Sequence, residues 1–292
     1  MYVTLDPCHM LKLARNALGS LSTFIDQNGG KIKWEFFKNL HALQQQEDLK
    51  LSNRLTTQHL EFKKHKINVR LAAQTLSSSV ADAFEFLDMS MKMSEFQDSQ
   101  STVTFIRTID KLFDMLNSRN PIGKGYKEPL RPNSKDIWEN SLKTAAEYLL
   151  SLRTDDGQLL TSHRRKTFIT GFVTTIKSTI EMANEMFYGL KSPFKYLLTY
   201  KYSQDHLELL FSCIRSRGGW NNNPNTLQLK YALRKMLMRN SITASKNANC
   251  TDFSDGSPTN IIPIFHAKKH NSPLIEQPEG CLENNQVNKQ VP

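Results

Sequence analysis

Apolar side chains recur at helical spacing along most of the chain as far as residue 239, which predicts a mostly α-helical protein. Two short runs, 2–5 and 31–34, are predicted to be strands instead. The expected helices cover residues 7–18, 34–49, 68–91, 101–116, 136–152, 165–189 and 203–217. From residue 240 to 292 the pattern stops and Asn, Ser, Pro and Gln dominate, so this tail is predicted to be disordered.

The expected helix 203–217 carries two stripes of different character. The buried stripe is expected to contain Leu207, Leu210, Phe211 and Ile214. The polar stripe contains Asp205, Glu208, Ser212 and Arg215. Ser203 is the expected N-cap, and Gly218 with Gly219 is expected to end the helix. The two carboxylates either lie on the surface, where the helix dipole favours them, or have partners that offset the cost of their burial.

Asp6 stands where the strand 2–5 is expected to end, with Pro7 suited to the first position of the following helix. A carboxylate in such a place is held rigidly, which suits a metal ligand. Residues 6–18, DPCHMLKLARNAL, resemble the block around the second catalytic Asp of P-element-type transposases. Residues 204–225, QDHLELLFSCIRSRGGWNNNPN, resemble the block that carries the last catalytic carboxylate of the same family, which includes the THAP-domain transposases of animals.

The resemblance implies that Asp6 and Glu208 are catalytic residues that bind metal. Transposases of this kind use three carboxylates to hold two divalent ions, Mg²⁺ or Mn²⁺. One ion activates the attacking water or 3′-hydroxyl, and the other stabilises the leaving oxygen. The first carboxylate and a zinc-binding DNA-recognition domain are expected upstream of Asp6. We therefore expect a truncated relative that does not cut DNA by itself.

The resemblance covers about residues 1–238 and implies a partial RNase H-like α/β domain interrupted by a large helical insertion. Residues 1–34 would form the truncated N-terminal part of that domain, and 196–239 its C-terminal part. Residues 35–195 would form the helical GTP-binding insertion domain, and 240–292 the disordered tail.

The segment FDMLNSR, residues 113–119, resembles the part of the insertion domain that reads guanine. The carboxylate of Asp114 can accept from both N1–H and N2–H₂ of guanine, a pairing that adenine does not offer. Asn117 can donate to O6 or N7, and Phe113 can lie against the base. The alternative is an exposed Asp and Asn near the C-terminus of a helix.

Phosphate groups need cations and free backbone N–H groups. Lys63, Lys64 and Lys66 precede the expected helix 68–91, whose N-terminus presents unpaired N–H groups. The same run is equally consistent with a solvated basic segment, and the sequence does not separate Lys66 from Lys64 as the phosphate ligand. Asp205 is a further candidate, toward the metal of the nucleotide or its base.

The net charge of +10 favours a polyanionic partner such as DNA, with an ordinary soluble basic protein as the alternative. Two basic clusters, 163–166 and the set Lys230, Arg234, Lys235 and Arg239, either contact the phosphate backbone or form an ordinary exposed surface. The four Cys are scattered without a CxxC pair, which fits reduced thiols in the nucleus or cytosol. No apolar run approaches about 18 residues, so no membrane span is expected.

The family activity implied by the resemblance is GTP-dependent and metal-dependent DNA strand cleavage and transfer. The expected compartment is the nucleus, and the sequence leaves open whether the chain forms a homo-oligomer. A second hypothesis is a non-catalytic regulatory protein that keeps binding to GTP, DNA or a protein partner. A third is a helical protein of unrelated function, which would require both transposase-like blocks to be coincidental.

Overall fold

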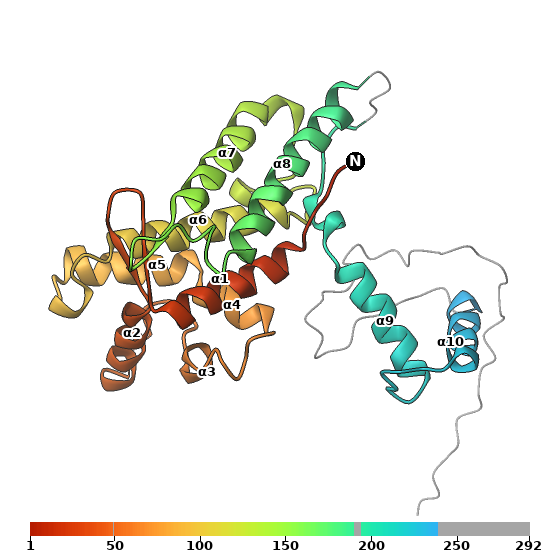
Figure 1. Cartoon of the computed structure of the whole chain (residues 1–292), viewed down its shortest axis with the longest axis horizontal. Coiled ribbons are helices and arrows are strands. Elements are labelled where there is room, and N and C mark those ends of the chain that lie inside the picture. The colour runs from red at the N-terminus through yellow and green to blue at the C-terminus, as the bar shows by residue number, and fades with distance from the viewer. Residues whose placement is uncertain (49, 190–193, 239–292) are drawn as a thin grey trace, which may run out of the picture. The chain divides into compact units, whose positions relative to one another are not determined.

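The computed structural model describes residues 1–48, 50–189 and 194–238 (Figure 1). The chain divides into two compact units, of which the first ends at Ser212 in its described part and the second begins at Cys213. The expected disordered tail 240–292 lies outside the described residues. Within the described ranges no helix is long and apolar enough to cross a bilayer.

The described residues are mainly helical, as the apolar periodicity predicted. The α-helices are α1 (Pro7–Leu21), α2 (Glu35–Gln46), α3 (Thr57–Leu60), α4 (Val69–Thr75), α5 (Ser78–Glu85), α6 (Gln100–Leu116), α7 (Lys135–Ser151), α8 (Thr167–Tyr188), α9 (Asp205–Arg217) and α10 (Thr226–Met238). The shorter helical turns are η1 (Phe86–Ser90), η2 (Ser94–Phe96), η3 (Gly125–Lys127), η4 (Pro132–Ser134) and η5 (Thr199–Tyr202).

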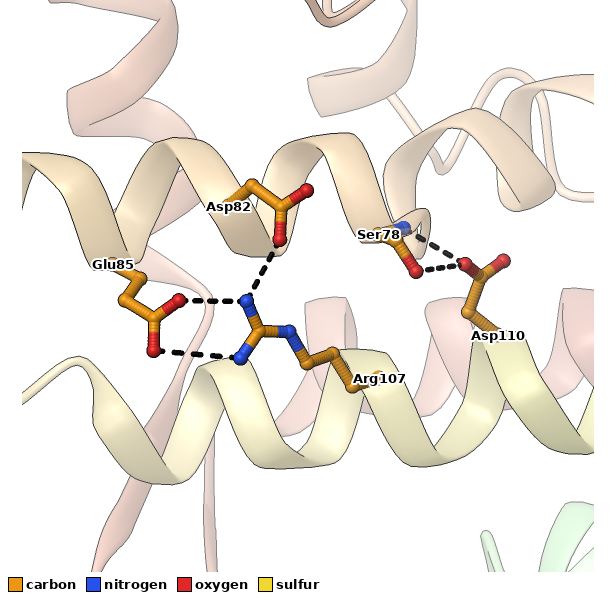
Figure 2. A network of polar contacts seen from close by, with 5 residues as sticks. All are labelled: Ser78, Asp82, Glu85, Arg107 and Asp110. Atoms are coloured by element: carbon orange, nitrogen blue, oxygen red, sulfur yellow. Dashed lines mark hydrogen bonds and ion pairs between the residues drawn. The ribbon is translucent and has the colours of Figure 1, made fainter.

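The expected long helix 68–91 is instead three successive elements, α4, α5 and η1. The break falls at Leu76 and Ser77, because the first turn of α5 is held by a residue far along the chain. The backbone N–H and the hydroxyl of Ser78 both donate to the carboxylate of Asp110 on α6, at 2.9 and 2.5 Å (Figure 2). The apolar pattern continues across the break because α4 and α5 both bury their apolar residues in the same core.

A second polar contact fastens α5 to α6. Arg107 on α6 lies between Asp82 and Glu85 on α5, with its Nη2 2.7 Å from a carboxylate oxygen of each (Figure 2). Together with the bond from Ser78 to Asp110, this pair fixes the register between the two helices.

Residues 2–5 form no strand within the described chain, contrary to the expectation. Their backbone is bound by hydroxyl groups of α8: Val3 N–H donates to Ser178 Oγ at 3.1 Å, and Leu5 N–H donates to Thr175 Oγ1 at 2.9 Å. Thr175 Oγ1 in turn donates to the carbonyl of Leu5 at 3.1 Å. Side-chain hydroxyls therefore take the place of a neighbouring strand.

The sheet is small, and it has the order β2–β1–β3 with antiparallel pairing throughout. It consists of β1 (Thr23–Ile25), β2 (Lys31–Lys33), where a strand was expected, and β3 (Arg153–Thr154). Phe24 of β1 is fully buried and packs against Phe105 of α6 and Phe168 of α8. Through Phe24 the sheet shares one core with α6 and α8.

Helix α1 lies inside this core, where it contacts α4, α6 and α8. Its contact with α8 depends on Gly171, since a Cβ added there would lie 2.0 Å from Sδ of Met10. Helices α7 and α8 lie side by side (Figure 1). The packing of α1 against α4, α6 and α8 holds this helix in place, and Asp6 stands at its N-terminus.

Candidate nucleotide and metal site

Asp6 is the N-cap of α1, and its carboxylate accepts hydrogen bonds from the backbone N–H groups of Cys8 at 3.3 Å and His9 at 3.0 Å. Pro7 occupies the first helical position, as its fixed φ favours. Burial raises the pKa of Asp6, and the two backbone N–H groups oppose that effect. The negative charges of Asp205 and Glu208 raise the pKa of Asp6 further. The structure therefore brings together Asp6 and Glu208, which are about 200 positions apart in the sequence.

Asp205 and Glu208 belong to the first turn of α9, where the helix dipole favours negative charge. Asp205 is buried, while Glu208 is exposed. The carboxylate of Asp205 accepts from Nη2 of Arg119 at 2.8 Å. Its burial is thus offset by a charged partner, the second of the two alternatives that the sequence left open.

Arg119 was not among the residues singled out from the sequence, although it ends the segment FDMLNSR. Its Nη2 also donates to Oδ1 of Asn117 at 3.2 Å, and its guanidinium lies over the ring of Tyr200 at 5.8 Å. One side chain thus joins the guanine-reading candidate Asn117 to Asp205 on the candidate catalytic helix.

Backbone contacts hold the end of α6 against the segment that leads into α9. Ser118 N–H donates to Thr199 Oγ1 at 3.0 Å, and Tyr200 N–H donates to the carbonyl of Ser118 at 3.2 Å. Thr199 Oγ1 donates to the carbonyl of Met115 at 2.7 Å, which satisfies an unpaired carbonyl in the last turn of α6. These fully or partly buried bonds keep the two segments in one fixed arrangement.

Asp114 lies on the last turn of α6 with a quarter of its side chain exposed. Burial raises the pKa of Asp114 to about 6, although the ammonium group of Lys127, 3.8 Å away, acts in the opposite direction. A mostly buried carboxylate near an exposed lysine is suited to accept paired N–H donors from a ligand. Lys127 was not singled out from the sequence, because it lies in the loop 119–135.

Phe113 and Asn117 lie with Asp114 at the C-terminal end of α6. Phe113 is partly buried and packs against the core, so only part of its ring remains for a ligand. Asn117 is the C-cap of α6 and uses its Oδ1 to accept from Arg119. Its amide group keeps donor capacity, which is the role expected toward guanine O6 or N7.

Lys64 and Lys66 lie in the turns between α3 and α4, before the N-cap Asn68. Both side chains are exposed, and Nζ of Lys64 is 2.8 Å from Oε1 of Glu61. Because Lys64 already has a carboxylate partner, Lys66 is the better placed of the two to attract an anion. Its own backbone carbonyl accepts from Asn16 of α1 at 3.0 Å.

The described residues contain no group of three or more His, Cys, Asp or Glu side chains arranged to hold a metal ion. Asp6 and Glu208 contribute two carboxylates, and the third nearby, Asp205, is bound to Arg119.

The buried stripe expected on α9 is wrong in part. Leu207 and Phe211 are 55% and 54% exposed, whereas Leu209 is 2% exposed. The cause is the bond from Arg119 to Asp205, because positions 205 and 209 share one face of a helix. Turning Asp205 inward buries Leu209 and carries Leu207 and Phe211 outward.

A cavity of about 440 Å³ lies elsewhere, between α6 and α7. It is lined by Thr104, Thr108, Lys111, Tyr126, Ser141 and Tyr148 among others, on a face of α6 that does not include Asp114 or Asn117. The candidate residues for guanine are therefore not part of the wall of this cavity.

Comparison with protein families assigns two segments of the chain. Residues 8–129 match the TNP-like GTP-binding insertion domain, and residues 200–234 match the TNP-like RNase H C-terminal domain. The first match contains the segment 113–119, and the second contains both Asp205 and Glu208.

Two curated proteins are similar over most of the chain. The human DNA transposase THAP9 is 35% identical over 212 residues, which are 72% of this chain and 23% of the human protein. The transposable element P transposase of Drosophila melanogaster is 26% identical over 243 residues, 82% of this chain and 30% of that protein. The chain therefore spans less than a third of the length of either relative.

Among solved structures, the Drosophila P element transposase strand transfer complex has a similar fold. The TM-score is 0.65 at 24% identity, and the match covers 80% of this chain and 50% of that chain. The mostly helical architecture expected from the sequence is confirmed by this likeness.

Proposed function

Because this chain is homologous to P-element-type DNA transposases over its GTP-binding insertion and RNase H-like segments, we propose that it binds GTP and does not cleave DNA by itself. The observation that carries this proposal is the bridge made by Arg119 between Asn117 and Asp205. Through this bridge, a nucleotide bound at the end of α6 would contact the same helix that carries Glu208.

The base would be read by Asp114, Asn117 and Phe113. The carboxylate of Asp114 would accept both N1–H and N2–H₂ of guanine, the amide of Asn117 would donate to O6 or N7, and the exposed part of Phe113 would lie on the ring. A site built to pair with two donors rejects a base that lacks them, because its own polar groups then stay unpaired. GTP would therefore be preferred over ATP.

The phosphate groups would be bound by Lys66, with Lys64 as a second cation once its contact with Glu61 is given up. Asp205 would bind either the metal ion of the nucleotide or its base, and Arg119 would hold the Asp205 carboxylate in place for this contact. Lys127 would leave Asp114 on binding, because a 3.8 Å contact to an exposed lysine is weak.

Asp6 and Glu208 would be ligands of the catalytic ions, Mg²⁺ or Mn²⁺, for which oxygen ligands are suited. Such ions would supply an activated nucleophile and stabilise a leaving oxygen. Asp205 is bound to Arg119, and we derive no cleavage step for this chain.

DNA would be a partner through its phosphate backbone, with the nucleus as the compartment. The support is the net charge of +10 and two basic clusters. In the cluster 163–166, Arg164 and Lys166 are exposed, and on α10 Lys230, Arg234 and Lys235 are exposed. Arg239 of the second cluster lies outside the described residues. A homo-oligomer is compatible with this proposal. The expected domains also remain part of it: an RNase H-like domain formed by 1–34 and 196–239, the GTP-binding insertion domain 35–195 and the tail 240–292.

A second candidate is a regulatory protein derived from a transposase, which binds GTP, DNA or a protein partner without nuclease activity. It is favoured by the ligand set at Asp6, which falls short of three carboxylates within the described chain. The two candidates share GTP binding and differ in whether a longer protein containing this segment cleaves DNA.

The test is a calorimetric titration of the purified 292-residue chain with GTP and with ATP, after cooperative unfolding has been established. We expect GTP to bind at least about a hundredfold more tightly than ATP, on the pattern of sites that hydrogen-bond their ligand. Equal affinities would remove the guanine assignment, and absence of any nucleotide binding would remove the proposed function.

A further inference from the structure

Arg15 is a fully buried charge in the middle of α1. Its side chain is 0% exposed, and no carboxylate among the described residues forms an ion pair with it. Burial alone lowers the pKa of Arg15 to about 10. A buried cation without a counter-ion is costly, so its presence needs a compensating role.

The guanidinium of Arg15 is directed at one short loop. Its Nη2 donates to the carbonyl of His65 at 2.8 Å and more weakly to that of Lys66 at 3.4 Å. Its Nε donates to Oδ1 of Asn16 at 2.9 Å, and Nδ2 of Asn16 donates to the same Lys66 carbonyl at 3.0 Å. Two adjacent residues of α1 thus hold the backbone of the basic segment 63–66.

The remaining nitrogen, Nη1, has no hydrogen-bond acceptor within the described chain and no contact with solvent. The positive charge of Arg15 is therefore only partly offset by the carbonyl groups. In a region of low dielectric such a charge favours an anion nearby much more strongly than an exposed lysine does. The backbone carbonyls that Arg15 binds belong to the basic segment 63–66, whose lysine side chains are exposed.

We propose that Arg15 and Asn16 are positioning residues for polyphosphate, which hold the segment 63–66 in the conformation that binds the phosphate groups of the nucleotide. The proposal rests on the proposed GTP binding, but it assigns a role to residues buried beneath the site. Three lysines within four positions repel one another, and a loop fixed in advance loses less entropy when the ligand binds.

The geometry also links the phosphate segment to the metal-binding candidate. Arg15 and Asp6 stand nine positions apart on α1, which at 1.5 Å per residue separates them by about 13 Å along the helix axis. Because one rigid helix carries both, a ligand that orders the segment 63–66 acts on the element whose N-cap is Asp6.

The experiment measures binding of GTP, GDP, guanosine and inorganic tripolyphosphate to the full chain and to the variants Asn16→Ala and Arg15→Met. In the wild type we expect affinity to rise from guanosine to GDP to GTP. In both variants the ratio of GTP to guanosine affinity should fall at least tenfold, while guanosine affinity changes less than twofold. The control Lys38→Ala removes one exposed charge on α2, whose Nζ lies 2.9 Å from a carboxylate oxygen of Glu35. It should change neither the guanosine affinity nor the ratio of GTP to guanosine affinity by more than twofold.

Each outcome decides the proposal. If the variants only melt at lower temperature and keep the wild-type ratio of GTP to guanosine affinity, Arg15 and Asn16 are purely structural and the proposal fails. If the wild type binds tripolyphosphate but not guanosine, and the variants lose tripolyphosphate, the positioning role holds while the guanine site is refuted. If the wild type shows no affinity for tripolyphosphate, the positioning role is refuted. Should Arg15→Met not fold, Asn16→Ala decides alone.

Discussion

Arg119 donates a 2.8 Å hydrogen bond to the carboxylate of Asp205, across 86 positions of sequence. The bond sets the rotation of α9, and with it the positions of Leu209, Leu207 and Phe211. Asp205 also lies near Asp6, whose pKa is raised mainly by burial and further by the negative charges of Asp205 and Glu208. This ion pair, together with the bonds of Ser118 and Thr199, holds the start of α9 against the end of α6.

Replacing Arg119 by Met should destabilise the first unit by about 1.5–3 kcal/mol, the range for hydrogen bonds to charged groups. The full cost of a buried pair is not expected, since 29% of the Arg119 side chain is exposed. The measurement is urea unfolding of Arg119→Met, Asp205→Asn and the double variant. A double variant whose loss equals the sum of the two single losses would mean that the two residues do not interact.

Asp114→Asn should weaken GTP and favour xanthosine triphosphate, whose O2 accepts from the new amide. The physical reason is donor–acceptor matching at the base, so the effect should exceed about tenfold in the ratio of the two affinities. Lys66→Ala serves as the matched control, because loss of a phosphate contact weakens both nucleotides alike. Unchanged GTP affinity in Asp114→Asn would refute the role of Asp114, even if GTP binds at another place.

The raised pKa of Asp114 predicts that the free energy of unfolding of the chain depends on pH. Its pKa of about 6 lies above the ordinary value of 3.8, so the folded chain binds an extra proton between these values. The free energy of unfolding should therefore fall as pH rises from about 4 to about 6. Asp114→Asn lacks this loss and should be more stable than wild type above pH 6, by about 1–2 kcal/mol after allowance for partial exposure.

The check is denaturant unfolding of both proteins at pH 4, 5, 6 and 7. The difference between the two curves isolates Asp114, because Asp6, whose pKa is also raised, is present in both. Parallel curves across this range would show that Asp114 does not titrate as its burial implies.

We expect no DNA cleavage by this chain with Mg²⁺ or Mn²⁺ present. Two carboxylates, Asp6 and Glu208, hold a pair of ions poorly. The assay is cleavage of plasmid DNA by the purified chain, with Glu208→Ala prepared in parallel. Strong cleavage that disappears in Glu208→Ala would show that the metal site is complete and that our interpretation is wrong.

Most of the fold could be predicted from the sequence because helices bury residues at a local and regular spacing. The ranges of α2, α6, α7 and α8 follow from that spacing alone. The break at Ser77 could not be predicted in this way, since the residue that holds Ser78 is Asp110, on another helix. Residues 2–5 were wrongly predicted to be a strand. Their sequence has the pattern of a strand, but their backbone is bound by hydroxyl groups of α8 and not by another strand.

The candidate site could be predicted only where a resemblance named its residues. Asp6 and Glu208 came from the two transposase-like blocks, and the structure places their charges close together. Their roles in catalysis, like those of Asp114 and Asn117 in reading guanine, stay predictions. Arg119 and Arg15 were missed because their partners lie 86 and 50 positions away, which no local pattern records.

The contact between α5 and α6 has a consequence for the order in which the chain opens (Figure 2). Helix α5 spans only eight residues, too few to persist in water without its neighbours. The amide of Ser78 is protected by Asp110, and the outer face of α5 is held by Arg107. Amide hydrogens of α5 should therefore exchange with solvent only when α6 detaches, so that both helices open as a single cooperative segment.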